Sequence, residues 1–201
     1  MKISVFVSGR GSNLKAIINS PELKNKVEVA LIISDKVFCP AFEIAKKYSI
    51  PHYTLGIKQG GIEIDELLNL FDRNNIELIV LAGYLKIIPS EITNRYKNQI
   101  INIHPALLPS FGGKGMYGMK VHKAVFDSSC KVSGATVHFV DESYDTGKII
   151  AQRCVDISDA QSPEEIAARV LEVEHQLLPA VIKMFIENRI WFKNGRVQIT
   201  N

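Results

Sequence analysis

Apolar runs of strand length alternate with helical segments through the first half of the chain. Residues 2–7 (KISVFV) predict a buried strand, the turn GRGSN follows at residues 9–13, and residues 13–19 predict a helix. Further apolar strands are predicted at 28–33 and 77–82, with helices at 41–47 and 64–74 between them. Such alternation is typical of βαβ units, so we expect an α/β, Rossmann-like fold: a mostly parallel twisted sheet with helices on both faces.

The pattern changes after residue 102. A glycine-rich loop at 112–118 precedes a predicted helix at 121–127, and two β-rich runs at 133–140 and 148–157 flank an acidic segment like a hairpin. The capping box SPEE at 162–165 predicts a long helix with a kink near Pro179. Asn194-Gly195 is a favoured two-residue turn between strands at 189–192 and 196–199. No linker or repeat interrupts the sequence, so residues 1–201 are expected to form a single domain.

Composition narrows the class of protein. The net charge is +3 and the lysines are spread along the chain, which argues against a nucleic-acid partner and suits a small anionic substrate. Cys39, Cys130 and Cys154 are odd in number and scattered, so no disulfide framework is expected. No apolar run approaches the ~20 residues that cross a bilayer, and no cleavage-like site follows the first strand. We therefore expect a cytoplasmic protein without a membrane partner.

The segment NIHPALLP at residues 102–109 is the strongest chemical signal. Asn102 and His104 are two residues apart at the end of an apolar strand, so their side chains share one face. Pro105 biases His104 toward extended backbone, and open α/β sheets bind ligands beyond the carboxyl ends of their strands. An amide and an imidazole in this place suit the binding of an electrophile. Taken alone, a histidine before a proline is more often a packed turn residue.

The turn GRGSN allows more than one interpretation. Two glycines between a strand and a helix suggest a dinucleotide fingerprint, with Asp35 at a suitable distance for a ribose hydroxyl. The third glycine of that motif is replaced by Leu14, which weakens the interpretation. A compact turn at a helix N-terminus also suits a single phosphate, with Ser12 and Asn13 adding side-chain donors. The simpler interpretation is a tight β-to-α connection capped by Ser12 or Asn13, and both interpretations can hold at once.

The acidic segment DESYDTG at residues 141–147 is similarly ambiguous. Asp145 could lie against His104, where a carboxylate raises the pKa of an imidazole and favours a charged donor near neutral pH. A solvated acidic turn of Asp141, Glu142 and Asp145 is the simpler interpretation. The spacing lacks the alternation of a calcium loop, and no cluster of histidines and cysteines supplies zinc ligands. No metal is expected.

Glu174 lies on the flank of the apolar stripe of the C-terminal helix. A carboxylate in this position is either half-exposed or bonded to a ligand. The remaining histidines lack a partner pattern and are interpreted as structural or surface residues. They are His52, His122, His138 and His175.

Four motifs together resemble the folate-dependent formyltransferases of purine biosynthesis, the phosphoribosylglycinamide formyltransferase family. They are SGRGSNL at 8–14, LAGYL at 81–85, NIHPALLP at 102–109 and DESYDTG at 141–147. Arg169-Val170 and Glu174-His175 follow at matching places on the C-terminal helix. The resemblance runs from end to end of the chain, and the order and spacing of the motifs make it specific.

The resemblance implies the formyltransferase fold and transfer of a formyl group from 10-formyltetrahydrofolate to the glycine amine of glycinamide ribonucleotide. It implies catalytic roles for Asn102, His104 and Asp145, with the first two stabilising a tetrahedral intermediate. Two further sets of residues follow from it. The substrate would be bound by Gly11, Ser12, Asn13 and Glu174, and the folate by Leu85, Lys86, Ile87, Ile88 and Asn102.

The resemblance is incomplete at residues 61–65, where the chain has no arginine to bind the glutamate tail of the folate. Two rival enzymes share the chemistry. A formyltetrahydrofolate deformylase is expected to need an N-terminal regulatory domain, and a methionyl-tRNA formyltransferase a C-terminal tRNA-binding domain, for which 201 residues leave no room. A nucleotide-binding or oxidoreductase module that uses only the first turn is a rival of another class. Either a monomer or a homodimer is compatible with the sequence.

Overall fold

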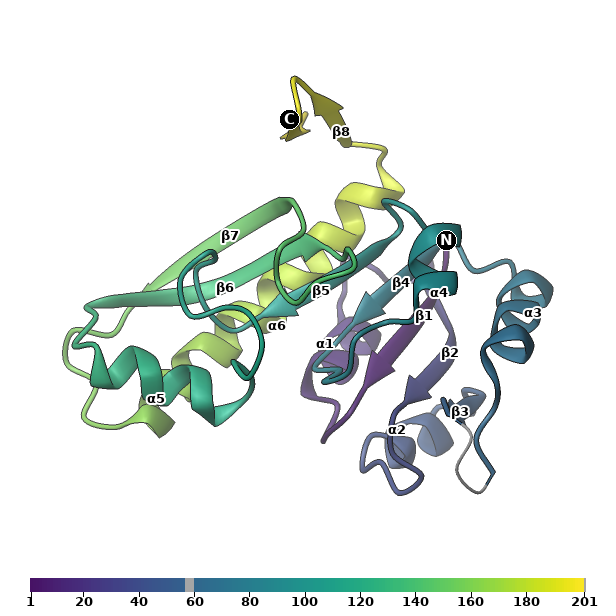
Figure 1. The fold of residues 1–201 in the computed structure, drawn as a ribbon, viewed down its shortest axis with the longest axis horizontal. Coiled ribbons are helices and arrows are strands. Elements are labelled where there is room, and N and C mark those ends of the chain that lie inside the picture. Colours follow the sequence, from purple (N-terminus) through teal and green to yellow (C-terminus); the bar gives the residue numbers. More distant parts are fainter. Residues whose placement is uncertain (57–59, 201) are drawn as a thin grey trace. The chain divides into compact units, whose positions relative to one another are not determined.

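The computed structural model describes residues 1–56 and 60–200 (Figure 1). The chain divides into two compact units, Met1–Asn102 and Ile103–Asn201. Within the described residues, no helix is both long and apolar enough to cross a membrane. Helices and strands alternate in the first unit as expected, and the α/β class with a mostly parallel sheet is confirmed.

The first unit contains a parallel sheet in which β1 is central. β1 pairs in parallel with β2 and with β4, β2 pairs with β3, and β4 pairs with the first residues of β5. The strands are β1 (Lys2–Val7), β2 (Glu28–Ser34), β3 (His52–Thr54), β4 (Leu78–Leu81) and β5 (Ile100–His104). The helices are α1 (Ser12–Asn19), α2 (Phe42–Lys47), α3 (Ile64–Asn74) and α4 (Ser90–Arg95).

Continuous burial explains the apolar runs of the central strands. All four residues of β4 are buried, as are the last five residues of β1. A parallel strand covered on both faces needs apolar side chains at every position, so its sequence lacks the polar alternation of a half-exposed strand. Phe6 of β1 packs edge-on against Phe71 of α3, with ring centroids 6.3 Å apart.

Two short elements of the first unit were not expected from the sequence. β3 has three residues and α4 has six. Segments this short carry too little periodicity to be separated from loops, and they form because neighbouring elements supply their partners. Ile32 to Ser34 of β2 provide the pairing edge for β3.

The second unit begins with the end of β5 and contains an antiparallel pair and a long helix. Its elements are α5 (Met119–Asp127), β6 (Val132–Phe139), β7 (Ile149–Asp156), α6 (Pro163–Ile186), β8 (Ile190–Lys193) and β9 (Arg196–Ile199). β6 and β7 pair antiparallel on either side of the acidic segment, which confirms the expected hairpin. β8 and β9 form a separate two-stranded sheet around the turn at 194–195.

α6 starts at the expected capping box. The Ser162 hydroxyl accepts a hydrogen bond from the Glu165 N–H at 3.2 Å, and Pro163 occupies the first helical position. Pro179 lies inside this 24-residue helix, where its ring removes one backbone donor. The kink expected near Pro179 stays a prediction. α5 begins at Met119, two residues before the expected start.

Candidate functional site

The turn after β1 and the segment after β4 contact each other at the carboxyl ends of these two strands, at one edge of the parallel sheet of the first unit. The N–H of Ser8 donates to the carbonyl of Gly83 at 3.2 Å, and the Ser8 hydroxyl accepts from the N–H of Leu85 at 3.0 Å. Carboxyl ends of neighbouring parallel strands share one edge of a sheet, which is where α/β proteins bind ligands. The residues expected to bind phosphate and those expected to bind folate are therefore neighbours within this unit.

Gly11 is the N-cap of α1 and has left-handed backbone, with φ of 74°. It has no side chain to cap the helix, so the expected cap by Ser12 or Asn13 is wrong: both lie in the first turn of α1. No acidic side chain occupies this first turn. The amides at the start of α1 therefore present a partial positive charge without a carboxylate beside them, as an anion site requires.

Substitution of Gly11 is expected to disturb both folding and this turn. A Cβ at Gly11 would lie 2.9 Å from the Cβ of Ala41, and left-handed backbone costs an L-residue about 1–2 kcal/mol. We expect Gly11→Ala to lower the free energy of unfolding by at least that amount and to raise the KM for the ribonucleotide. Gly9→Ala is the matched control, because a Cβ at Gly9 meets no atom within 4 Å. Equal losses in urea titrations of both variants would contradict the prediction.

The segment expected to bind folate presents apolar side chains at the surface. Leu85 and Ile87 are 39% and 50% exposed, whereas Ile88 is buried. Lys86 is exposed, and Asn102 is partly buried on β5 beside Leu81 of β4. Two exposed aliphatic side chains next to backbone polar groups are the kind of surface on which a flat heterocycle can pack. Ile88 would contribute only its backbone to such a site.

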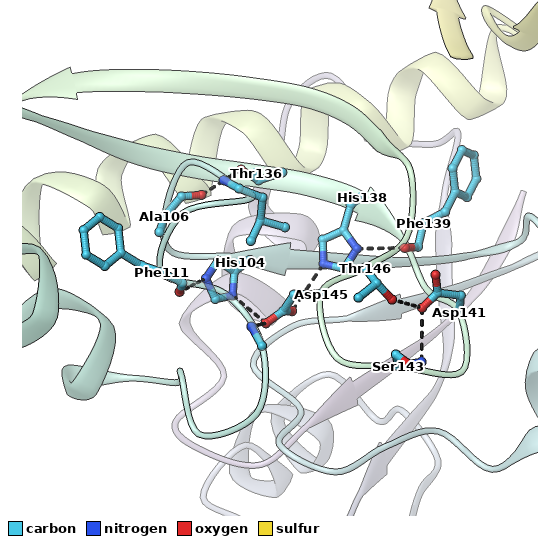
Figure 2. A network of polar contacts seen from close by, with 12 residues as sticks. His104, Ala106, Phe111, Thr136, His138, Phe139, Asp141, Ser143, Asp145 and Thr146 are labelled. Carbon is cyan, nitrogen blue, oxygen red and sulfur yellow. Dashed lines mark hydrogen bonds and ion pairs between the residues drawn. The ribbon is translucent and has the colours of Figure 1, made fainter. Parts of the chain in front are cut away.

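In the second unit, the chain after His104 is tied to β6 and β7. The Thr136 hydroxyl donates to the carbonyl of Ala106 at 2.7 Å and accepts from the N–H of Leu108 at 3.1 Å (Figure 2). Gln152 donates to the carbonyl of Leu108 at 2.9 Å. These hydrogen bonds, of which the two made by Thr136 are buried, fix the turn that follows the strand, so the imidazole of His104 has a defined position.

His104, Asp145 and His138 form a buried network at the end of β5 (Figure 2). Nδ1 of His104 lies 3.5 Å from Oδ2 of Asp145, and Nε2 of His138 lies 3.5 Å from Oδ1 of the same carboxylate. Nε2 of His104 lies 2.9 Å from the carbonyl oxygen of Phe111 and therefore carries a hydrogen. One carboxylate thus lies between two imidazoles, and all three side chains are at most 11% exposed.

Burial dominates the protonation of His104. Desolvation lowers the pKa of this imidazole below its ordinary value of 6.5. The Asp145 carboxylate and the Phe111 carbonyl raise it, but by less, and His138 lowers it further. The expectation of a charged imidazole near neutral pH is therefore wrong, because the degree of burial could not be seen in the sequence.

Asp145 remains ionised in spite of its burial. Desolvation raises the pKa of its carboxyl group, but hydrogen bonds from His138 and from the Gly113 N–H, together with the charge of His104, bring the pKa below 3.8. Gly113 donates to Oδ2 at 2.9 Å. The carboxylate is consequently available as a negatively charged partner for His104 over the physiological pH range.

The acidic segment separates into a buried and a solvated part. Asp141 and Glu142 are exposed, and Asp141 Oδ1 accepts from the Ser143 N–H at 3.1 Å and the Thr146 hydroxyl at 2.7 Å. Asp145 instead points inward with left-handed backbone, φ 57°. The solvated interpretation holds for the first two acids and is wrong for Asp145.

Glu174, His122 and His138 are buried. Glu174 on α6 is 8% exposed, which excludes the half-exposed alternative. His138 was interpreted as structural or superficial, yet it contacts the Asp145 carboxylate. The available signal was its place at the end of a strand that leads into the acidic loop. His122 on α5 is also buried and lies near enough to His104 for that imidazole to lower its pKa, after burial itself.

Three partly or fully buried histidines predict a loss of stability in mild acid. Burial lowers the pKa of His104, His122 and His175 below 6.5 in the folded chain. As the pH falls, the histidines of the unfolded chain bind protons before those of the folded chain. The free energy of unfolding is therefore highest above the histidine pKa of the unfolded chain, and it decreases as the pH falls toward the lower pKa values of the folded chain. We expect the free energy of unfolding from urea titrations to fall between about pH 7.5 and 5.5. The slope should be shallower in His122→Gln, and a free energy that is constant or rises over this range would exclude the effect.

Known proteins match the sequence and the fold. The family model for formyl transferases matches residues 1–182. A chloroplastic phosphoribosylglycinamide formyltransferase of Arabidopsis thaliana is 42% identical over 206 residues, covering all of this chain and 70% of the relative. That of Bacillus subtilis is 38% identical, covering 92% of this chain and 94% of the relative. The crystal structure of the enzyme from Anaplasma phagocytophilum aligns with a TM-score of 0.88 at 30% identity, covering 100% of this chain and 95% of the other.

These matches confirm the resemblance first indicated by the four motifs. They extend over both units, and the family model includes β5, the acidic loop and most of α6. The structural alignment also confirms the formyltransferase fold. The chain therefore belongs to the formyl transferase family, among the phosphoribosylglycinamide formyltransferases.

Proposed function

We propose that this enzyme transfers the formyl group of 10-formyltetrahydrofolate to the glycine amine of glycinamide ribonucleotide, giving formylglycinamide ribonucleotide in purine (IMP) biosynthesis. The observation that carries the proposal is the buried pair of His104 and Asp145. His104 of this pair lies on β5, two residues after Asn102. Family membership supports the same reaction, because the relatives described above are named for it.

Asn102 and His104 are proposed to stabilise the transition state. Attack of the amine on the formyl carbon places negative charge on the formyl oxygen. An N–H donor aimed at that oxygen stabilises the charge, and one such donor contributes roughly 3–4 kcal/mol. Asn102 and His104 are alternate residues of one strand. The Nε2–H of His104 donates to the Phe111 carbonyl in the free enzyme and would have to exchange that acceptor for the formyl oxygen when the substrates bind.

His104 is proposed to move the proton that the reaction transfers. The amine loses one proton and N10 of the folate gains one, so no net proton is needed from the enzyme. The lowered pKa of His104 suits a group that accepts a proton and returns it, directly or through a water. The Asp145 carboxylate would stabilise the imidazolium while it exists. Such proton transfer typically contributes ~10²- to 10⁴-fold in rate.

The start of α1 is proposed to hold the substrate phosphate. Gly11, Ser12 and Asn13 present backbone amides at the positive end of the helix. Glu174 is proposed to hydrogen-bond the ribose hydroxyls or the amide of the substrate.

The segment after β4 is proposed to bind the folate. Backbone groups of residues 85–88 would read the pterin, and the exposed side chains of Leu85 and Ile87 would cover its faces. Asn102 would contact both co-substrates. The chemistry is complete with these organic substrates, so no metal is proposed.

The cellular setting follows from the same reasoning. We place the enzyme in the cytoplasm, where its three free cysteines would stay reduced, although the Arabidopsis relative is chloroplastic. The two units would act as a single domain, as a monomer or a homodimer, on small-molecule substrates and without a nucleic-acid or membrane partner. Size-exclusion chromatography with light scattering measures the oligomeric state.

A spectrophotometric assay tests the reaction. Purified protein is mixed with glycinamide ribonucleotide and 10-formyl-5,8-dideazafolate, and release of the deformylated folate is followed. We expect release only when the ribonucleotide is present. Release without it would identify a deformylase, and no release by a folded sample would favour a binding module.

A further inference from the structure

The C-terminal hairpin, β8 and β9 with the turn at 194–195, contacts both ends of the loop that carries Asp145. This loop, residues 140–147, is closed at its base by a hydrogen bond from the Phe139 N–H to the Lys148 carbonyl at 2.9 Å. The ring of Phe192 in β8 packs on the ring of Phe139, with centroids 5.3 Å apart. The ammonium group of Lys148 donates to the carbonyl of Gly195. One element thus contacts the residue before the loop and the residue after it.

Phe139 is linked to Asp145 by close contacts. Its carbonyl lies 2.7 Å from Nδ1 of His138, whose Nε2 reaches the Asp145 carboxylate (Figure 2). Gly147 packs against the same carbonyl so closely that a Cβ would lie 1.8 Å from the oxygen. Movement of Phe139 would therefore displace an imidazole that holds Asp145 and one end of the loop.

The hairpin is held together by its own backbone hydrogen bonds and can therefore support the neighbouring loop. β8 and β9 pair at four positions, and the Thr200 N–H donates to the Arg189 carbonyl at 3.0 Å below them. Side chains alternate along β8, so Phe192 and Trp191 belong to opposite faces. Phe192 packs on Phe139, whereas Trp191 lies near Lys193, whose ammonium is 5.8 Å from the indole.

We propose that the C-terminal hairpin is a positioning element for formyl transfer: through Phe192 and Lys148 it holds the 140–147 loop so that Asp145 stays against His104. The kinetic consequence of this role rests on the proposed function. The effect on the position of Asp145 does not rest on the proposed function, because it can be measured in the protein without substrates.

The titration of His104 reports where Asp145 lies. The carboxylate raises the pKa of His104, while burial and His138 lower it. His122 is the other titrating group near His104. If the hairpin contacts are lost and the carboxylate moves away while the His104 imidazole stays buried, the pKa of His104 falls further below 6.5, because burial is its largest contribution and then acts unopposed by Asp145.

The first experiment is an NMR titration of the His104 imidazole in the full chain. We expect a lower pKa in Phe192→Ala than in the wild type, and the wild-type value in Phe192→Tyr, which keeps the ring. Trp191→Ala is the matched control, because Trp191 is the adjacent residue with nearly equal exposure, 41% against 43%. It should titrate like the wild type. Lys148→Met removes the second contact and should shift the pKa in the same direction, even if Phe192→Ala fails to fold.

Kinetics provide the second readout. Misplacement of a catalytic group by a fraction of an ångström lowers the rate of the chemical step, so we expect Phe192→Ala to lose about tenfold to a hundredfold in kcat. Its KM for the ribonucleotide should stay within about twofold of the wild type, because the phosphate turn is unchanged. Trp191→Ala should keep both constants.

Two results would overturn the proposal. The first is a set of variants that lose thermal stability while His104 titrates as in the wild type. The second is an equal shift of the His104 pKa in Phe192→Ala and Trp191→Ala, which would indicate general loosening of the hairpin. Absence of transfer by the wild type would count against the proposed function alone, since the titration does not depend on turnover.

Discussion

Replacing His104 with alanine is expected to lower kcat by about 10²- to 10⁴-fold. The change removes the donor proposed for the formyl oxygen and the group proposed to pass a proton to the folate nitrogen. The turn after His104 should keep its structure in this variant. Thr136 and Gln152 hold that turn through hydrogen bonds that do not involve the imidazole. The KM values should change much less than kcat, since both roles are exerted in the transition state.

Two controls separate chemistry from folding in this prediction. His104→Gln keeps a hydrogen-bond donor but cannot titrate, so it should keep more kcat than alanine yet stay far below the wild type, while unfolding at a similar urea concentration. His52→Ala removes an imidazole from β3, where it contacts Phe42, and should keep kcat in the fraction that is folded. An unchanged kcat in His104→Ala would remove this residue from the mechanism.

Asp145→Asn is expected to lower kcat by about 10²- to 10⁴-fold without large changes in KM. Asparagine has the same shape and can still accept from the Gly113 N–H, but it carries no charge. Because the carboxylate raises the pKa of His104, its loss moves that pKa further down and leaves the imidazolium without a counter-ion. NMR should therefore show His104 titrating at lower pH in this variant than in the wild type.

Glu142→Gln is the matched control for Asp145. It removes an acid three residues away in the same loop, where the side chain is exposed. Removing an exposed charge changes stability little, so this variant should keep the wild-type kcat and the wild-type titration of His104. If both amide variants lost the same activity, the effect would come from loop charge in general and not from the contact with His104.

Much of the fold followed from local patterns in the sequence. β1, α3 and the β8–β9 hairpin appear within a residue of where apolar periodicity and turn signals predicted them. These elements are long enough, or have turns specific enough, for local physics to decide their structure. The three-residue strand β3 and the short helix α4 escaped prediction because only pairing and packing partners far along the chain stabilise them.

The candidate site was predicted in part. His104 and Asp145, 41 residues apart in the sequence, were paired correctly as neighbours, because the motifs around them resemble one family. His138 was missed: its place at the end of a strand that leads into the acidic loop was a signal, but it does not show that the carboxylate seven residues later folds back toward the imidazole. The balance of pKa effects on His104 was also misjudged, because the opposing contributions depend on depth and distance.

The α/β class, the positions of most strands and helices, and the family could all be predicted from the sequence. These depend on periodicity, turn chemistry and motif order, all of which are local properties of the chain. Only the tertiary structure decided that Asp145 is buried while Asp141 and Glu142 are solvated, and that His104 is more easily deprotonated than a free imidazole. Solvation and electrostatic energies depend on which groups surround a charge, and folding brings those groups from β5, β6 and the loop before β7.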